Sequence, residues 1–72
     1  MSKYAVVFEK SQSGYGAYVP DLPGCVAAAA TLKEAEKLIR EGIELHLDGM
    51  LEDGDEIPTP TTIAEMIDVT AA

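Results

Sequence analysis

Apolar runs separated by short polar stretches mark the first twenty residues. Residues 4–9 are mostly β-branched or aromatic, which predicts a strand. The polar residues 11–14 predict a hairpin connection. Residues 15–19 form a second predicted strand, which ends at Pro20 because proline has no N–H to donate to a neighbouring strand.

Residues 21–24, Asp-Leu-Pro-Gly, are typical of a type II turn, because Pro23 presets φ and Gly24 tolerates a positive φ. Residues 25–30 follow and begin with Cys25, which we expect to be a small buried apolar residue. Alanine favours helices, so this run is ambiguous. We interpret it as a third strand, because two strands alone are barely stable.

The next segment carries a strong helix start signal. Thr31 and Glu34 are spaced as a capping box, in which Thr31 accepts from the Glu34 backbone and Glu34 reaches back to Thr31. Apolar residues then recur at offsets of three and four over 35–50. This pattern predicts a helix that runs to about residue 48 or 49, with Gly49 in the left-handed conformation.

Two residues on the apolar stripe of this helix are unusual. Gly42 costs about 1 kcal/mol relative to alanine there, so we predict that it allows the backbone of the third strand to approach closely. His46 stands alone among apolar residues and is interpreted as a packed or interface histidine.

After the helix, residues 52–56 form an acidic turn that lacks the spacing of a calcium-binding loop. We therefore expect no metal site. Residues 57–62 are broken by prolines and should be extended. Residues 63–69 fit either a final strand or a short helix capped by Thr62, and we favour the strand.

Charge changes this picture by dividing the chain. The 72 residues carry a net charge of −8. Residues 1–40 hold five bases and four acids, whereas residues 41–72 hold nine acids and no base. An acidic protein this small cannot neutralise phosphates, which argues against direct nucleic-acid binding. The acids either form a solvated surface or recognise a basic partner. For the latter role the candidate residues are Glu41, Glu44, Asp48, Glu52, Asp53 and Asp55.

Other classes are excluded by what the chain lacks. The N-terminus has no apolar leader, and the longest purely apolar run, residues 25–30, is far shorter than the roughly 20 residues of a membrane helix. A single cysteine cannot form an internal disulfide. We therefore predict one cytoplasmic domain over residues 1–72 with no membrane association.

Three motifs together resemble the HicB family of type II toxin–antitoxin antitoxins over residues 3 to about 69. They are Val19-Pro20-Asp21-Leu22-Pro23-Gly24-Cys25, Thr31-x-x-Glu34-Ala35 and Ile57-Pro58-x-Pro60. The chain departs from the family at Ala29 and Ala30, where relatives commonly place a glycine and an acid. It also ends without the DNA-binding domain of many HicB proteins, so we expect a short form that does not bind operators.

The resemblance implies an α+β fold, a partial ribonuclease H-like arrangement β-β-β-α-β. It would contain a three-stranded antiparallel sheet, one amphipathic helix and a fourth strand beside the first. It further implies a homodimer or larger homo-oligomer that neutralises a small basic RNA-cleaving HicA-type toxin, without a cofactor. The acidic residues could stand where RNA phosphates would, and would speed encounter with a basic partner.

Two other functions compete with this one. A ribonuclease H-like enzyme needs carboxylates that converge on two metal ions, one usually from the centre of the first strand. Residues 5–8 at that centre are apolar, so we predict that the protein is not an enzyme. The alternative is a homo-oligomeric interaction module that has no toxin partner.

Overall fold

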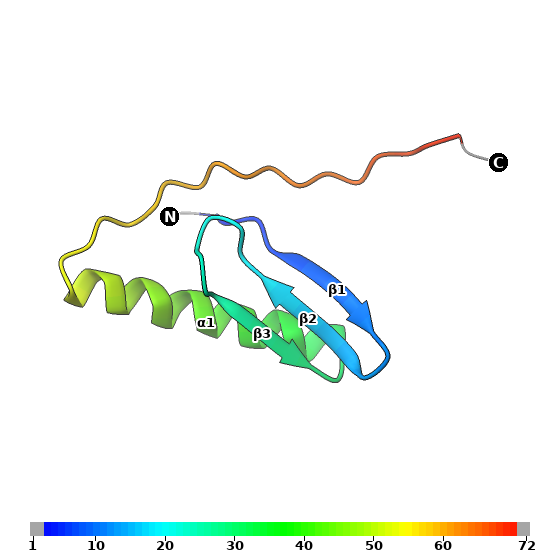
Figure 1. Ribbon diagram of the computed structural model, residues 1–72, viewed down its shortest axis with the longest axis horizontal. Coiled ribbons are helices and arrows are strands. Elements are labelled where there is room, and N and C mark those ends of the chain that lie inside the picture. Colours follow the sequence, from blue (N-terminus) through cyan, green and yellow to red (C-terminus); the bar gives the residue numbers. More distant parts are fainter. Residues whose placement is uncertain (1–2, 71–72) are drawn as a thin grey trace.

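A three-stranded sheet and one helix make up the fold. The computed structural model describes residues 3–70 and contains β1 (Val7–Ser11), β2 (Gly14–Tyr18), β3 (Val26–Ala29) and α1 (Leu32–Glu52). The strands lie in the order β1-β2-β3, and both neighbouring pairs are antiparallel. The helix covers one face of the sheet (Figure 1). The predicted α+β fold with a three-stranded antiparallel sheet and one helix is thereby confirmed.

The hairpin is tighter than predicted. Ser11 pairs with Gly14, so only two residues lie between β1 and β2, and β1 is shifted toward the C-terminus relative to the prediction. These two residues are Gln12 and Ser13, and neither has a positive φ.

The core lies between the sheet and α1. Phe8, Ala17 and Ala27 are aligned across the three strands and share the face that meets the helix. α1 contributes Ala35 and Ile39, which are buried. The helix packs against β3 and β2, and consequently the residues of the β1 side are only partly buried.

The loop between β2 and β3 is part of this core. The Cys25 N–H donates to the Leu22 carbonyl at 3.0 Å, and Gly24 has φ +86°. These features confirm the turn predicted at Leu22-Pro23-Gly24-Cys25, and Gly24 is where positive φ is required. Pro20 and Pro23 remain exposed, whereas Leu22 is 0% exposed and Cys25 is buried.

The two ends of α1 differ in how well they were predicted. The Glu34 N–H donates to the Thr31 hydroxyl oxygen at 3.1 Å, which confirms the cap. The Glu34 carboxylate accepts from the Thr31 hydroxyl, not from its backbone. The predicted end at Gly49 is wrong, because the helix continues to Glu52 and the left-handed glycine is Gly54, with φ +75°.

The predicted role of Gly42 is also wrong. A Cβ atom at this position would contact only the Cys25 sulfur, at 3.8 Å, and no backbone atom of β3 lies within 4 Å. Gly42 instead borders a shallow cavity of about 270 Å³ between α1 and the start of β3. His46 lies partly buried on the same cavity, beside Leu45.

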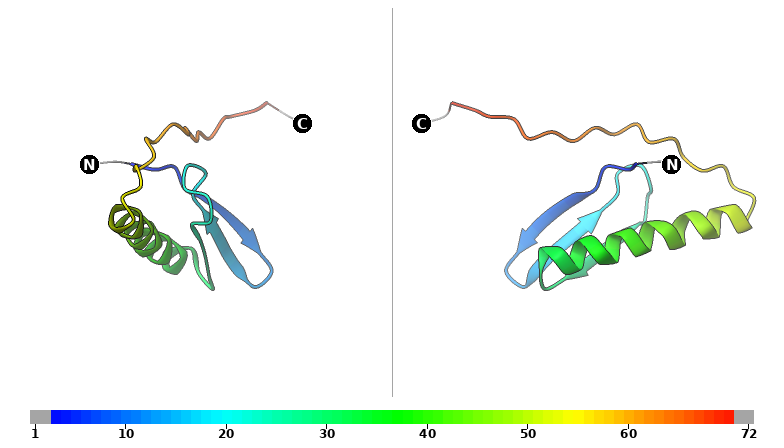
Figure 2. Two further views of the ribbon diagram at one scale, coloured as in Figure 1. Left: turned by 60° about the vertical axis from the view of Figure 1, so that its left-hand side comes forward. Right: turned by 180° about the vertical axis from the view of Figure 1, so that it is seen from behind.

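The final predicted element is not formed. Residues 63–69 are neither the fourth strand nor the alternative short helix, but an extended segment. A strand must lie about 4.8 Å from its neighbour, whereas this segment leaves the sheet beyond the start of β1 in every view (Figures 1 and 2). The ribonuclease H-like arrangement implied by the resemblance is therefore not completed within this chain.

Candidate partner interface

Four of the six predicted acidic residues lie on α1 and two follow it, and we call all six the acidic stripe. Its helical members follow one another at offsets of three or four, so they share one face of α1 over about 16 Å. The remaining two lie in the turn after the helix. All six side chains are exposed: Glu41, Glu44, Asp48, Glu52, Asp53 and Asp55.

The C-terminal end of this stripe has no basic residue next to it in the sequence. Arg40 is the last base in the sequence, and the last turn of α1 contains no basic residue. The carbonyl groups at a helix C-terminus carry partial negative charge, so acids there are unfavourable by a few tenths of a kcal/mol each. The acids at the C-terminal end of the stripe thus oppose the stability of the helix that carries them.

The face of the sheet away from α1 is uncovered in residues 3–70 (Figure 2). Val7, Tyr18 and Val26 are aligned across the strands on this face. Tyr18 is 40% exposed and Val26 is 69% exposed. This face therefore exposes apolar side chains near β3.

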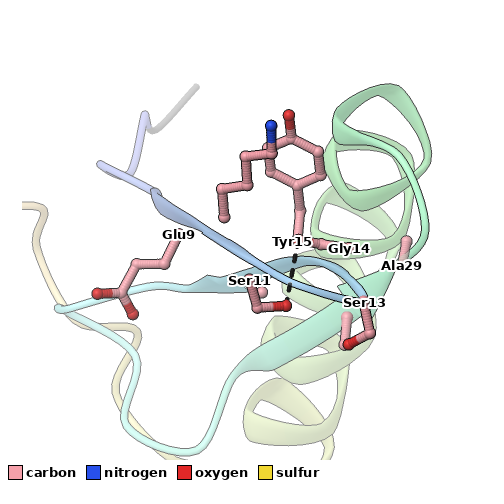
Figure 3. A pocket seen from close by; sticks show the side chains of 9 residues that line it. Glu9, Ser11, Ser13, Gly14, Tyr15 and Ala29 are labelled. Carbon is pink, nitrogen blue, oxygen red and sulfur yellow. Dashed lines mark hydrogen bonds between the residues drawn. The ribbon is translucent and has the colours of Figure 1, made fainter.

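At the hairpin end this face is hollowed into an open cavity of about 500 Å³. Gly14 and Gly16 contribute no side chains to it, while Glu9, Ser11 and Ser13 lie around it (Figure 3). The Ser11 hydroxyl donates to the Gly14 carbonyl at 3.2 Å. Within residues 3–70, no three side chains of His, Cys, Asp or Glu gather into a group that could hold a metal ion.

A polar contact that the sequence did not predict holds the C-terminal segment against the β2–β3 loop. The Asp21 carboxylate accepts hydrogen bonds from the backbone N–H groups of Thr61 and Thr62, both at 3.0 Å. It also accepts from their hydroxyl groups, at 3.1 Å for Thr61 and 2.8 Å for Thr62. We call these three residues the Asp21 clamp.

The clamp stabilises the charged form of Asp21. Hydrogen bonds from the Thr62 backbone and hydroxyl, followed by those from Thr61, lower the pKa of Asp21 from 3.8 to about 2 despite some opposing desolvation. Nearby, the Tyr4 hydroxyl donates to the Pro58 carbonyl at 2.6 Å. Asp21 belongs to a motif that the sequence singled out as a turn, but nothing in the spacing indicated that its carboxylate would bind residues forty positions later.

Beyond the clamp, the chain exposes an apolar segment. The side chains of Ile63, Met66, Ile67 and Val69 are between 71% and 99% exposed. No described helix is long and apolar enough to cross a bilayer. The chain therefore offers three surfaces to a partner: the acidic stripe, the open sheet face and this segment.

Comparison with known proteins identifies one family. Residues 4–71 match the family described as HicB-like antitoxin of bacterial toxin–antitoxin systems. Antitoxin HicB 2 of Photorhabdus laumondii is 33% identical over 63 residues, which cover 88% of this chain and 45% of that protein. A chain of the HicA3 and HicB3 toxin–antitoxin complex superimposes with a TM-score of 0.70 and 27% identity, covering 83% of this chain and 70% of that chain.

A relative without a known function shows higher identity. An uncharacterized 14.9 kDa protein of Haemophilus phage HP1 is 44% identical over 64 residues, or 89% of this chain and 48% of the phage protein. The chain thus spans about half the length of the phage and Photorhabdus relatives.

Proposed function

The chain belongs to the HicB-like antitoxin family of bacterial toxin–antitoxin systems, and on that premise we propose that it binds and neutralises a HicA-type toxin through the acidic stripe. The structural similarity to a complex of HicA3 with HicB3 supports a toxin as the partner. We expect the encounter to occur in the cytoplasm, as predicted from the sequence.

One observation carries the choice of surface. The acidic stripe places exposed carboxylates along about 16 Å of α1, and Glu52 and Asp53 lie at the helix end where acids are electrostatically unfavourable. Stability alone would favour Lys or Arg at these two positions. A complementary basic surface would convert this cost into faster and more specific association. Carboxylates of the stripe would then occupy the positions that RNA phosphates take on a basic RNA-cleaving toxin.

The test is a binding titration with the HicA-type toxin encoded in the neighbouring reading frame. Affinity should fall steeply as salt rises from 50 to 300 mM, because exposed charges are screened over about 10 Å at 0.1 M. The double variant Glu52→Lys with Asp53→Lys should bind about tenfold more weakly at low salt, with a shallower salt dependence.

Glu36→Lys is the matched control. It changes the charge on the same helix but lies outside the stripe, so its affinity should stay close to that of the unmodified protein. Binding that does not depend on salt, or an equal loss in the control, would exclude the acidic stripe as the recognition surface.

The second candidate function is a homo-oligomeric module without a toxin. The exposed apolar residues after the Asp21 clamp favour this module, because large exposed apolar side chains that lie close together are typical of association surfaces. The two functions differ in the neighbouring reading frame, where a short basic protein favours the antitoxin and its absence favours the module.

A further inference from the structure

Residues 63–70 follow the Asp21 clamp, and we call this segment the tail. Its backbone is free to pair with the edge of a sheet. It is extended, and no backbone–backbone hydrogen bond joins it to another described residue. Its large apolar side chains are 71–99% exposed, with Met66 at 99%. Exposed apolar side chains and unpaired backbone groups both favour association with another strand.

The outer edge of β1 is open in a matching way. Within residues 3–70, β1 pairs only with β2, so its other edge offers free N–H and C=O groups. The core beneath this edge is also incomplete, because α1 packs on β3 and β2 rather than on β1. Tyr4, Val6 and Phe8 therefore remain only partly buried.

We propose that the tail of one copy adds as a fourth strand to the outer edge of β1 in a second copy, and that two copies exchange tails in a symmetric dimer. Each copy then donates one strand and receives one. Such a reciprocal arrangement closes on itself and leaves no repeating edge for further addition.

Length and side-chain alternation fit this pairing. The tail has eight residues, and so does the segment 4–11 that contains β1 and its extended approach. Ile63, Glu65, Ile67 and Val69 occupy odd positions and share one face of an extended chain, so this face is apolar except at Glu65. Placed on the core side of the sheet, they would contact the partly buried residues of β1. The core would then be covered by the tail as well as by α1.

Charge also favours a second copy as the occupant. The tail carries Glu65 and Asp68 and no base, whereas residues 3–11, which include the segment that would receive it, carry Lys3, Glu9 and Lys10 and thus a net charge of +1. Both lysines are exposed. Residues 1–40 as a whole are slightly basic, with five bases and four acids. An acidic strand is therefore attracted to this edge and not repelled from it.

The clamp directs the tail away from its own sheet. Thr61 and Thr62 are bound to Asp21 at the β2–β3 loop, and the chain beyond them runs outward and diverges from β1 (Figures 1 and 2). The clamp thus fixes where the tail begins and presents it to solvent.

The first experiment measures mass by sedimentation velocity from 5 to 500 µM. The full chain should show the mass of two 7.6 kDa chains at the upper end of this range. Ile67→Pro should shift the species to one chain, because proline removes a donor and disrupts a central strand position. The control Thr59→Pro lies in the extended segment before the clamp and should remain dimeric. A monomeric full chain, or an Ile67→Pro variant that stays dimeric, would overturn the proposal.

The second experiment identifies the strand that receives the tail. A nitroxide is attached to the variant Val69→Cys, since burial of Cys25 raises the pKa of its thiol and slows its reaction. Chains that carry the nitroxide but no ¹⁵N are mixed with ¹⁵N-labelled chains that carry no nitroxide. Broadening of amide signals from residues 7–11 supports exchange between copies. Broadening confined to Val26–Ala29 would overturn the proposal. Broadening seen only when the nitroxide and the ¹⁵N label are on the same chain would overturn it too.

This inference does not depend on the toxin. Ile67→Pro leaves the acidic stripe unchanged, so loss of the dimer with retained salt-dependent toxin binding would separate the two surfaces. Loss of toxin binding in Glu52→Lys with Asp53→Lys, with the dimer retained, would separate them in the other direction.

Discussion

Leu22 is the residue on which the fold should depend most. It is fully buried, at 0% exposure, although it lies in the loop between β2 and β3 rather than in a strand or helix. Its carbonyl accepts from Cys25 and its N–H donates to the Val19 carbonyl at 3.0 Å, so the backbone holds the side chain in the core. Leu22→Ala removes this side chain while leaving both backbone hydrogen bonds possible.

The expected cost follows from the burial. Three carbon atoms leave the core at about 0.8 kcal/mol each, which gives roughly 2.4 kcal/mol. The cavity that remains raises the cost, and fully buried leucines typically lose about 3–5 kcal/mol in this substitution. A 72-residue protein has a free energy of unfolding of about 4–11 kcal/mol. Leu22→Ala should therefore remove between a quarter and nearly all of the stability.

Thermal unfolding followed by circular dichroism tests this value. A loss of about 3 kcal/mol corresponds to a fall in Tm of at least ~12 °C for a protein of this size. Leu51→Ala is the matched control, because Leu51 is 63% exposed near the end of α1 and its truncation should change stability by less than about 0.5 kcal/mol. Equal Tm values for the two variants at the same protein concentration would refute the assignment of Leu22 to the core.

Three further predictions concern the two glycines and the clamp. Gly14 has φ +149°, and a Cβ there would overlap the Ala29 carbonyl, so Gly14→Ala should lower the free energy of unfolding by about 1–3 kcal/mol or more in urea titrations. Gly42→Ala should instead raise it by up to about 1 kcal/mol in the same assay, because the added methyl meets only a sulfur atom at contact distance. The clamp stabilises the ionised form of Asp21, so its contribution is complete above pH 3.8 and is lost as pH falls through about 2. The Thr62 amide shift should follow that titration by NMR and lose it in Asp21→Asn.

Local signals in the sequence predicted the fold where a single short pattern determines the structure. The Pro23-Gly24 pair determined a turn, and the spacing of Thr31 and Glu34 determined the start of α1, because these motifs satisfy backbone groups within a few residues. The end of α1 was misplaced because two glycines compete as stop signals, and hydrogen bonds from Asp53 and Gly54 select the later one.

The C-terminal segment could not be predicted because its position depends on contacts between distant residues. Asp21 binds Thr61 and Thr62 across forty positions, and Tyr4 reaches Pro58 across fifty-four. Alternation in residues 63–69 favoured a strand that is not formed, because alternation alone does not reveal whether a neighbouring strand is available. Helical spacing also predicts that Glu41, Glu44, Asp48 and Glu52 share one face of α1, whereas the spacing alone does not indicate what this face binds.

The opposing demands of stability and recognition on that stripe give a final prediction. Glu52→Lys replaces an unfavourable charge at the C-terminus of α1 with a favourable one, so it should raise the free energy of unfolding by about 0.3–1 kcal/mol. The same substitution should weaken toxin binding at low salt. Glu36→Lys, on the N-terminal half of the helix, should give no such stabilisation and little loss of affinity. Urea titration and toxin binding are measured on the unmodified protein, Glu52→Lys and Glu36→Lys. Together they test the expected gain in stability and the expected loss of affinity. If Glu52→Lys destabilised the fold, its acid would have a structural role, and the argument that recognition maintains it would fail.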